Sequence, residues 1–173
     1  MVDIMDKLQK IGEIGKSPRE KQRLINVNEV FYVWDILVTK LDIMETIGIM
    51  ENFIEDIDLK FITGQLVKVL RSGIDEMEKL MKNYNIPFPI QPPAGSNLAV
   101  NWEGYSDRYI YISIFEGIQS FFPILSSGFM NSTSPKVRKA FKEHLLLTME
   151  LQELIVEYGK LKGFLNEPPV YRP

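Results

Sequence analysis

The chain has 173 residues, of which 45% are hydrophobic and 25% are charged, and its formal net charge is −3. This length suits one domain with a hydrophobic core of its own, and the composition is that of an ordinary globular protein. The sequence contains no cysteine, which excludes disulfide frameworks and thiolate metal sites, and no basic cluster with interleaved aromatic residues, which argues against nucleic acid as a partner.

Residues 1–25 are predicted to form an amphipathic helical arm. One side of residues 1–16 carries apolar side chains at helical spacing, namely Met1, Ile4, Met5, Leu8 and Ile11. A helix this short is unstable alone, so we expect it to dock on the rest of the chain, on a partner subunit or, less favourably because of its acidic residues, on a membrane surface. Those acidic residues also argue against a secretory signal and favour a cytoplasmic location. Ser17 and Glu20 form a capping box that predicts a second, short helix.

Residues 26–163 are predicted to form a four-helix bundle. Caps and helical apolar periodicity place the four helices at 27–55, 59–84, 106–129 and 135–160. In the first helix, the residues predicted to face the core are Val30, Val33, Trp34, Leu37, Leu41, Met44 and Gly48. The third helix is the most apolar, but its charged residues make it unsuited to span a membrane. Pro123 within it predicts a kink or a local break near Gln119.

The connection between the second and third helices is long enough to run the length of the bundle. It covers residues 86–106 and is rich in proline, glycine and asparagine. A helix of about 25 residues is roughly 37 Å long, whereas about 20 residues of extended chain cover roughly 60 Å. We therefore expect an all-α, ferritin-like, up-down-down-up bundle with a long crossover between its second and third helices. Residues 164–173 are predicted to form a Pro-rich C-terminal tail.

A ferritin-like bundle raises the question of a di-iron centre. Such a centre takes a glutamate from each of two helices and a Glu-x-x-His pair from each of the other two. The chain has a single histidine, His144, so it cannot supply two imidazole ligands. Its neighbour Glu143 points about 100° away around the helix. The complete di-iron motif is therefore absent from the sequence.

A reduced, mononuclear site is the remaining metal hypothesis. Its candidate ligands are His144, Glu76, Glu150, Glu45 and Glu116. His144 lies at the centre of the inward side of its helix, and one histidine with two or three carboxylates would suit Zn, Mn or Fe(II). Gly73, one turn before Glu76, leaves room for a neighbouring group. The opposing interpretation is that His144 is a hydrogen-bonded core residue and that the carboxylates are solvated.

Other chemistries lack the residues that they need. The sequence has no Gly-rich phosphate loop with its lysine, no G-x-S-x-G nucleophile turn and no distinguishable acid/base pair. It therefore favours a protein that is not an enzyme and that requires no cofactor. The aromatic third helix could instead line a ligand cavity or cover a subunit interface, and a homodimer is the expected assembly.

Five segments carry a resemblance to a known family. They are EVFYVW at Glu29–Trp34, IPFPIQPP after the second helix, Ser132–Lys139, Thr148–Leu151, and the closing G-x-L-x-G-F-L-x-x-P-P. Their order and spacing resemble an uncharacterised ferritin-like family of spore-forming Firmicutes, whose members are often called spore-coat-protein-like. The resemblance covers about residues 26–171, and the N-terminal 25 residues are an addition to it.

This resemblance implies a helical bundle, a spore-associated or intracellular setting and spore-coat partners. Some relatives carry a histidine on the second helix, and the matching position here is Glu76. The first expectation is therefore a non-enzymatic structural or interaction protein, related to spore-coat proteins. The alternative is a metal-binding protein with weak redox activity, built on Glu76, Glu150 and His144 with Glu45 or Glu116 in support.

Overall fold

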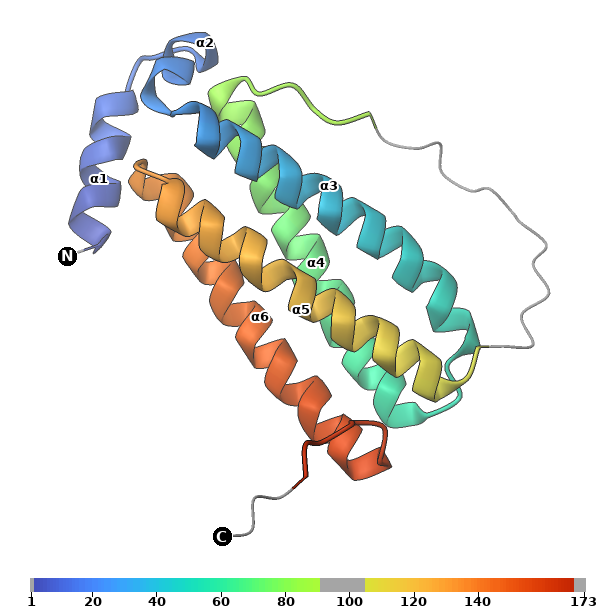
Figure 1. Ribbon diagram of the computed structural model, residues 1–173. Helices are drawn as coiled ribbons and strands as arrows, with labels where there is room; N and C mark the ends of the chain where they lie inside the picture. The colour runs from blue at the N-terminus through green and yellow to red at the C-terminus, as the bar shows by residue number, and fades with distance from the viewer. Residues whose placement is uncertain (1, 91–104, 170–173) are drawn as a thin grey trace, which may run out of the picture.

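The computed structural model describes residues 2–90 and 105–169, and throughout these ranges its regular secondary structure is helical (Figure 1). Four long helices pack as a bundle, and short helices precede them, as the sequence predicts. The elements in chain order are α1 (Val2–Glu13), α2 (Pro18–Lys21), the 3-10 turn η1 (Gln22–Leu24), α3 (Val27–Met50), the 3-10 turn η2 (Glu51–Phe53), α4 (Ile57–Tyr84), α5 (Asp107–Asn131) and α6 (Pro135–Lys162). No described helix is long and apolar enough to cross a membrane.

The helices run in two directions, which fixes the neighbours of each. α5 begins beside the turn between α3 and α4, where the Asp107 carboxylate accepts the backbone N–H groups of Glu55 at 2.9 Å and Asp56 at 3.0 Å. α4 and α5 therefore run parallel to one another and antiparallel to α3 and α6 (Figure 1). The predicted crossover joins opposite ends of the bundle, and its residues 91–104 lie outside the described part of the chain.

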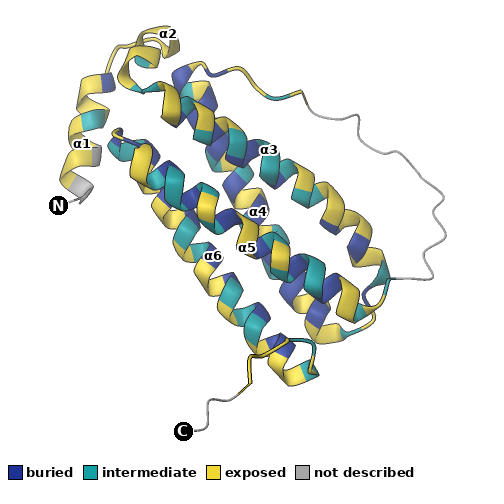
Figure 2. Ribbon diagram, in the orientation of Figure 1, coloured by how far each residue is buried: buried dark blue, intermediate teal, exposed yellow. Residues whose placement is uncertain are grey.

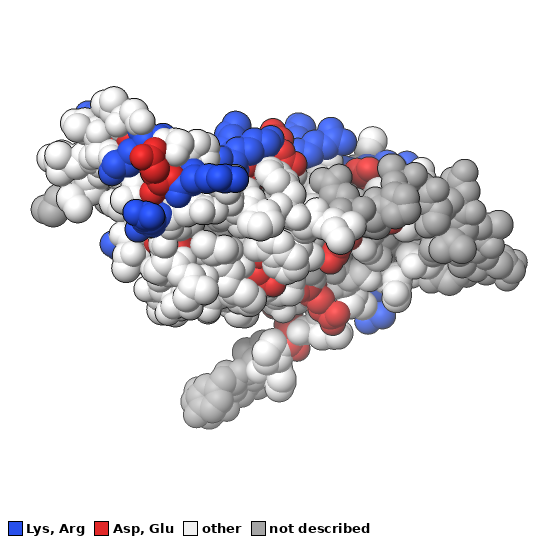
Figure 3. Space-filling view, turned by 90° about the horizontal axis from the view of Figure 1, so that it is seen from above, with Lys and Arg blue, Asp and Glu red and all other residues white. Residues whose placement is uncertain are grey.

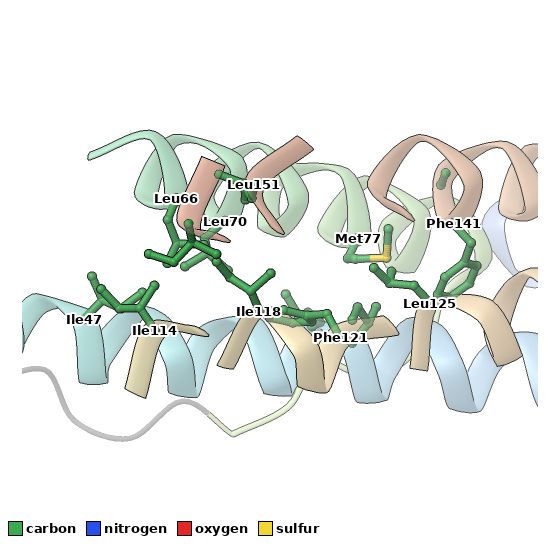
Figure 4. Packing of buried hydrophobic residues seen from close by; sticks show 14 of the residues in the cluster. Ile47, Leu66, Leu70, Met77, Ile114, Ile118, Phe121, Leu125, Phe141 and Leu151 are labelled. Carbon is green, nitrogen blue, oxygen red and sulfur yellow. The ribbon is translucent and has the colours of Figure 1, made fainter. Parts of the chain in front are cut away.

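All four long helices contribute to one hydrophobic core. Figure 4 shows Ile47 of α3, Met77 of α4, Leu125 of α5 and Phe141 of α6 directed toward the middle of the bundle. Buried residues follow one side of each helix, and exposed residues cover the outside (Figure 2). On α4 the apolar spacing predicts a core side that is buried except for Val69, which is half-buried. Its members are Leu59, Ile62, Leu66, Val69, Leu70, Gly73, Met77, Leu80 and Met81.

The predicted core side of α3 is only partly correct. Val33 and Leu37 are buried, but Val30, Leu41 and Met44 are half-buried, and Trp34 and Gly48 are exposed. The buried residues of the helix are Glu29, Val33, Ile36, Leu37, Lys40, Ile47 and Met50. The core side contains a glutamate and a lysine, which interrupt its apolar pattern. The sequence analysis assigned Trp34 to the core side because it did not count Glu29 and Lys40 as core residues.

Two further predictions differ from the structure: the end of the first long helix and a break within the third. The first long helix ends at Met50 rather than at residue 55, because the Asp56 side chain accepts the N–H groups of Asp58 and Leu59 and starts α4 at Ile57. α5 continues through Pro123, so no break in helical structure occurs there.

The N-terminal arm docks on the bundle through its polar side, not its apolar side. Gln9 Nε2 donates to Tyr84 Oη and Ser134 Oγ, both at 2.8 Å, and Gln9 Oε1 accepts the backbone N–H of Lys136 at 2.9 Å. Glu13 is buried and pairs with Lys136 Nζ at 2.6 Å. Burial alone would raise the pKa of Glu13, but its contacts with Lys136 leave that pKa below its ordinary value. The apolar side of α1 therefore faces outward.

Candidate functional site

The candidate site lies in the middle of the bundle, where four helices supply one group each. These groups are Lys40 from α3, Glu76 from α4, Phe121 from α5 and His144 from α6. Helical spacing places each on or beside the core side of its helix. Gly73 stands one turn before Glu76 on α4 and completes the site.

Lys40 occupies the space that Gly73 leaves open. Its side chain is 2% exposed, and a Cβ atom added at Gly73 would lie 2.7 Å from both Cε and Nζ of Lys40. Nζ also lies 4.9 Å from the centroid of the Phe121 ring, a cation–π distance. The lysine head group is thus held between α4 and α5.

The charge on Lys40 is poorly compensated. Burial lowers its pKa to about 8, and the negative charge of Glu76 opposes that shift only in part. Within residues 2–90 and 105–169, no hydrogen bond or close ion pair to Nζ is present. The charged form of Lys40 therefore costs folding free energy near neutral pH.

His144 and Glu76 form the closest polar contact at the site. Nε2 of His144 lies 2.9 Å from Oε2 of Glu76, and His144 is buried while Glu76 is partly open to solvent. Nδ1 of His144 has no hydrogen-bond partner in the described part of the chain. The contact with His144 lowers the pKa of Glu76, against the opposing effect of burial.

A shallow depression between α4 and α6 gives solvent access to this contact. It is lined by Ser72, Glu76, Glu143, His144, Leu146 and Leu147. Glu143 is exposed and lies 3.8 Å from Lys139, so its carboxylate belongs to the outer side of α6. Of the two carboxylates that line the depression, only Glu76 contacts the imidazole of His144, and the two form a ligand pair rather than a complete metal cage.

The structure brings together two of the five residues that the sequence offered as metal ligands. His144 and Glu76 are in contact, whereas Glu45, Glu116 and Glu150 are exposed on α3, α5 and α6. In residues 2–90 and 105–169, no three histidine, aspartate or glutamate side chains are grouped so that they could hold a metal ion.

Lys40 is the site residue that the sequence did not reveal. Two signals pointed toward it: Gly73 on the core side of α4, which required an occupant, and the position of Lys40 three residues after Leu37 on the core side of α3. A lysine on a helix usually extends its head group to water, so neither signal was sufficient alone.

A small apolar cavity lies beside α5, where a ligand cavity was one of the sequence-based alternatives. Its volume is about 80 Å³, and its lining includes Ile47, Leu66, Ile114, Gly117 and Phe121. Pockets for small-molecule ligands usually measure about 300–1,000 Å³. This cavity is too small to hold a lipid or a drug-sized ligand.

Comparisons with known proteins support the fold and do not assign a function. No family model and no curated protein sequence matches the chain. Among solved structures, the chain is similar to a putative spore coat protein from Bacillus halodurans, with a TM-score of 0.77 and 20% sequence identity. The match covers 86% of this chain and 96% of that chain. At this identity, the likeness establishes a shared helical-bundle fold.

Proposed function

We propose that the chain is a non-enzymatic structural or interaction protein, built on a ferritin-like bundle that carries no metal centre and working in a spore-coat or cytoplasmic setting. The observation that carries this proposal is Lys40 beside Gly73 in the middle of the bundle. Bundles of the di-iron class surround metal cations with carboxylates and histidines at their centre. Here the chain supplies the central cation itself. The spore-coat setting is supported by the description of the Bacillus halodurans neighbour.

The electrostatics of the site disfavour a second cation. A divalent metal near Glu76 would be repelled by the Lys40 ammonium at low effective dielectric, and it would have to displace the His144–Glu76 contact. A homodimer, with spore-coat proteins as further partners, is the assembly that we propose.

Metal binding is the second candidate, because one observation favours it. His144 and Glu76 lie 2.9 Å apart beside an open depression, so a Zn, Mn or Fe(II) ion could displace their contact and bind both. Glu150, Glu45 or Glu116 would then have to move inward, or water would have to complete the coordination. Weak redox activity would follow only with Mn or Fe.

Elemental analysis of protein purified without an affinity tag distinguishes the two candidates. We expect substoichiometric metal and an unchanged Tm on addition of Zn, Mn or Fe. A metal at about 100 times its Kd would stabilise the fold by about 2.7 kcal/mol. The matched variants are His144→Ala, at the candidate site, and Glu153→Ala, at an exposed position of the same helix. Stoichiometric metal that His144→Ala removes and Glu153→Ala retains would overturn the metal-free proposal.

A further inference from the structure

The apolar side of α1 is an interaction surface that the bundle leaves uncovered. Its members are Ile4, Met5, Leu8, Ile11 and Ile14, each between 53% and 76% exposed. They share one side of the helix and the turn that follows it, and we call them the α1 stripe. The opposite side of α1 is fixed to the bundle through Gln9 and Glu13. A contiguous exposed apolar surface of this kind marks a binding site.

Basic residues outnumber acidic ones at the end of the molecule that carries the α1 stripe. Residues 2–24 contain six basic and four acidic residues, and residues 132–143, at the start of α6 where α1 packs, contain four basic and one acidic. A hollow beside the stripe is lined by Met5, Phe129, Arg138, Lys139 and Lys142, among others. Figure 3 shows Lys and Arg side chains, with Asp and Glu side chains among them, over this end of the molecule.

The opposite end of the bundle is acidic and carries its own exposed apolar surface. Residues 41–60, which include the turn from α3 to α4, contain six acidic side chains and one basic one, and residues 151–162, at the end of α6, contain two of each, so this end is net acidic. Beside this turn, a groove between α4 and α6 is lined by Asp58, Phe61, Ile62, Leu154, Glu157, Tyr158 and Leu161. Phe61 is 62% exposed and Leu161 is 76% exposed. We call this surface the α4–α6 groove.

We propose that the α1 stripe of one copy of this chain docks in the α4–α6 groove of the next copy, so that copies associate head to tail. The proposal rests on the proposed structural function and names its partner. Each surface is apolar at its centre. Asp58 and Glu157 at the rim of the groove pair with Lys162 and Lys160 of the same copy, so the charge match lies between the two ends of the bundle as a whole, one net basic and the other net acidic. Joining unlike ends therefore matches both the apolar areas and the charges.

If two copies joined through identical ends, the interface would no longer bring opposite charges together. Two α1 stripes facing one another would bring two net basic ends together, and two grooves would bring together two net acidic ends. Like-charge juxtaposition across an interface costs free energy and slows encounter. A head-to-tail contact is heterologous, so it leaves one stripe and one groove unused in each dimer and allows further copies to add.

Analytical ultracentrifugation of two variants, separately and mixed, tests this proposal. Leu8→Glu places a charge in the α1 stripe, and Phe61→Glu places one in the α4–α6 groove; both residues are exposed, so the fold is retained. We expect the unmodified chain to form dimers and larger species as concentration rises, and each variant alone to be monomeric. Their equimolar mixture should form a dimer and nothing larger, because it contains one intact stripe and one intact groove. Added NaCl should weaken the association.

A control variant and the contradicting outcomes complete the test. Met149→Glu, at a residue that is 46% exposed on α6 outside both surfaces, should leave association unchanged. Association that survives both test variants, or a mixture that remains monomeric, would overturn the head-to-tail contact. So would binding to anionic lipid vesicles that Leu8→Glu abolishes while the unmodified chain stays monomeric. A monomeric chain without metal would refute this contact and leave the metal-free proposal intact, whereas stoichiometric metal would refute that proposal independently.

Discussion

Glu29→Ala is expected to lower the free energy of unfolding by about 3–5 kcal/mol. Glu29 is fully buried, and its Oε1 accepts the backbone N–H groups of Thr133 at 2.7 Å and Ser134 at 2.6 Å. Its Oε2 accepts the N–H of Asn26 at 2.7 Å, which completes the capping box of α3. The carboxylate thus ties the start of α3 to the turn before α6, and alanine would leave three amide donors without their acceptor. Urea unfolding at pH 7 measures the loss.

Glu20→Ala is the matched control for this prediction. Glu20 makes the same capping-box contact with Ser17 but lies on the surface in the short helix α2. We expect it to change stability little, because water replaces the lost contact. Glu29→Gln, which keeps one acceptor oxygen, should fall between the two. Equal effects of Glu29→Ala and Glu20→Ala would show that Glu29 does not join α3 to α6.

Lys40→Met is expected to stabilise the fold at pH 7, by on the order of 2–3 kcal/mol. The substitution removes a buried charge and keeps a long apolar side chain that fits the space over Gly73. Most core substitutions destabilise, so the sign of this effect is diagnostic. Lys68→Met, at an exposed position on α4, provides the control and should leave stability nearly unchanged.

The stabilising effect of Lys40→Met should shrink as the pH rises. The pKa of Lys40 is lowered from 10.5 to about 8 by burial in the folded chain, so the unfolded chain holds more protons between these pH values. Stability of the unmodified chain therefore increases with pH across this window, relative to the variant. Urea unfolding of both proteins at pH 7 and pH 10 gives the difference, and other titrating groups cancel in it. A Lys40→Met variant that is less stable at pH 7, or a pH-independent difference, would contradict this prediction.

The positions of the long helices were predictable because their signals are local. Asn26 and Ser134 cap α3 and α6 through contacts within a few residues, and Gly163 ends α6 in the left-handed conformation with a φ of 67°. The buried side of α4 followed directly from its apolar spacing. The buried side of α3 did not, because Glu29 contacts the turn before α6 and Lys40 contacts α5, both far away in the sequence.

The candidate site was predictable in part for the same reason. Apolar spacing placed His144 on the inward side of α6, and the resemblance drew attention to Glu76, which His144 contacts. The room beside Gly73 was also predicted, but its occupant was not, because Lys40 reaches it from a helix more than 30 residues earlier in the chain. The docking of α1 through Gln9 could not be predicted from the sequence either, because the partners of Gln9 lie on α4 and α6.

The central claim is that the cation in the middle of this bundle is the ammonium group of Lys40. An NMR titration of the lysine side chains tests it most directly, with the Lys40 signal identified by its loss in Lys40→Met. We predict a titration midpoint for Lys40 near pH 8. A midpoint at the ordinary value of 10.5 would place the amine in water and contradict the claim.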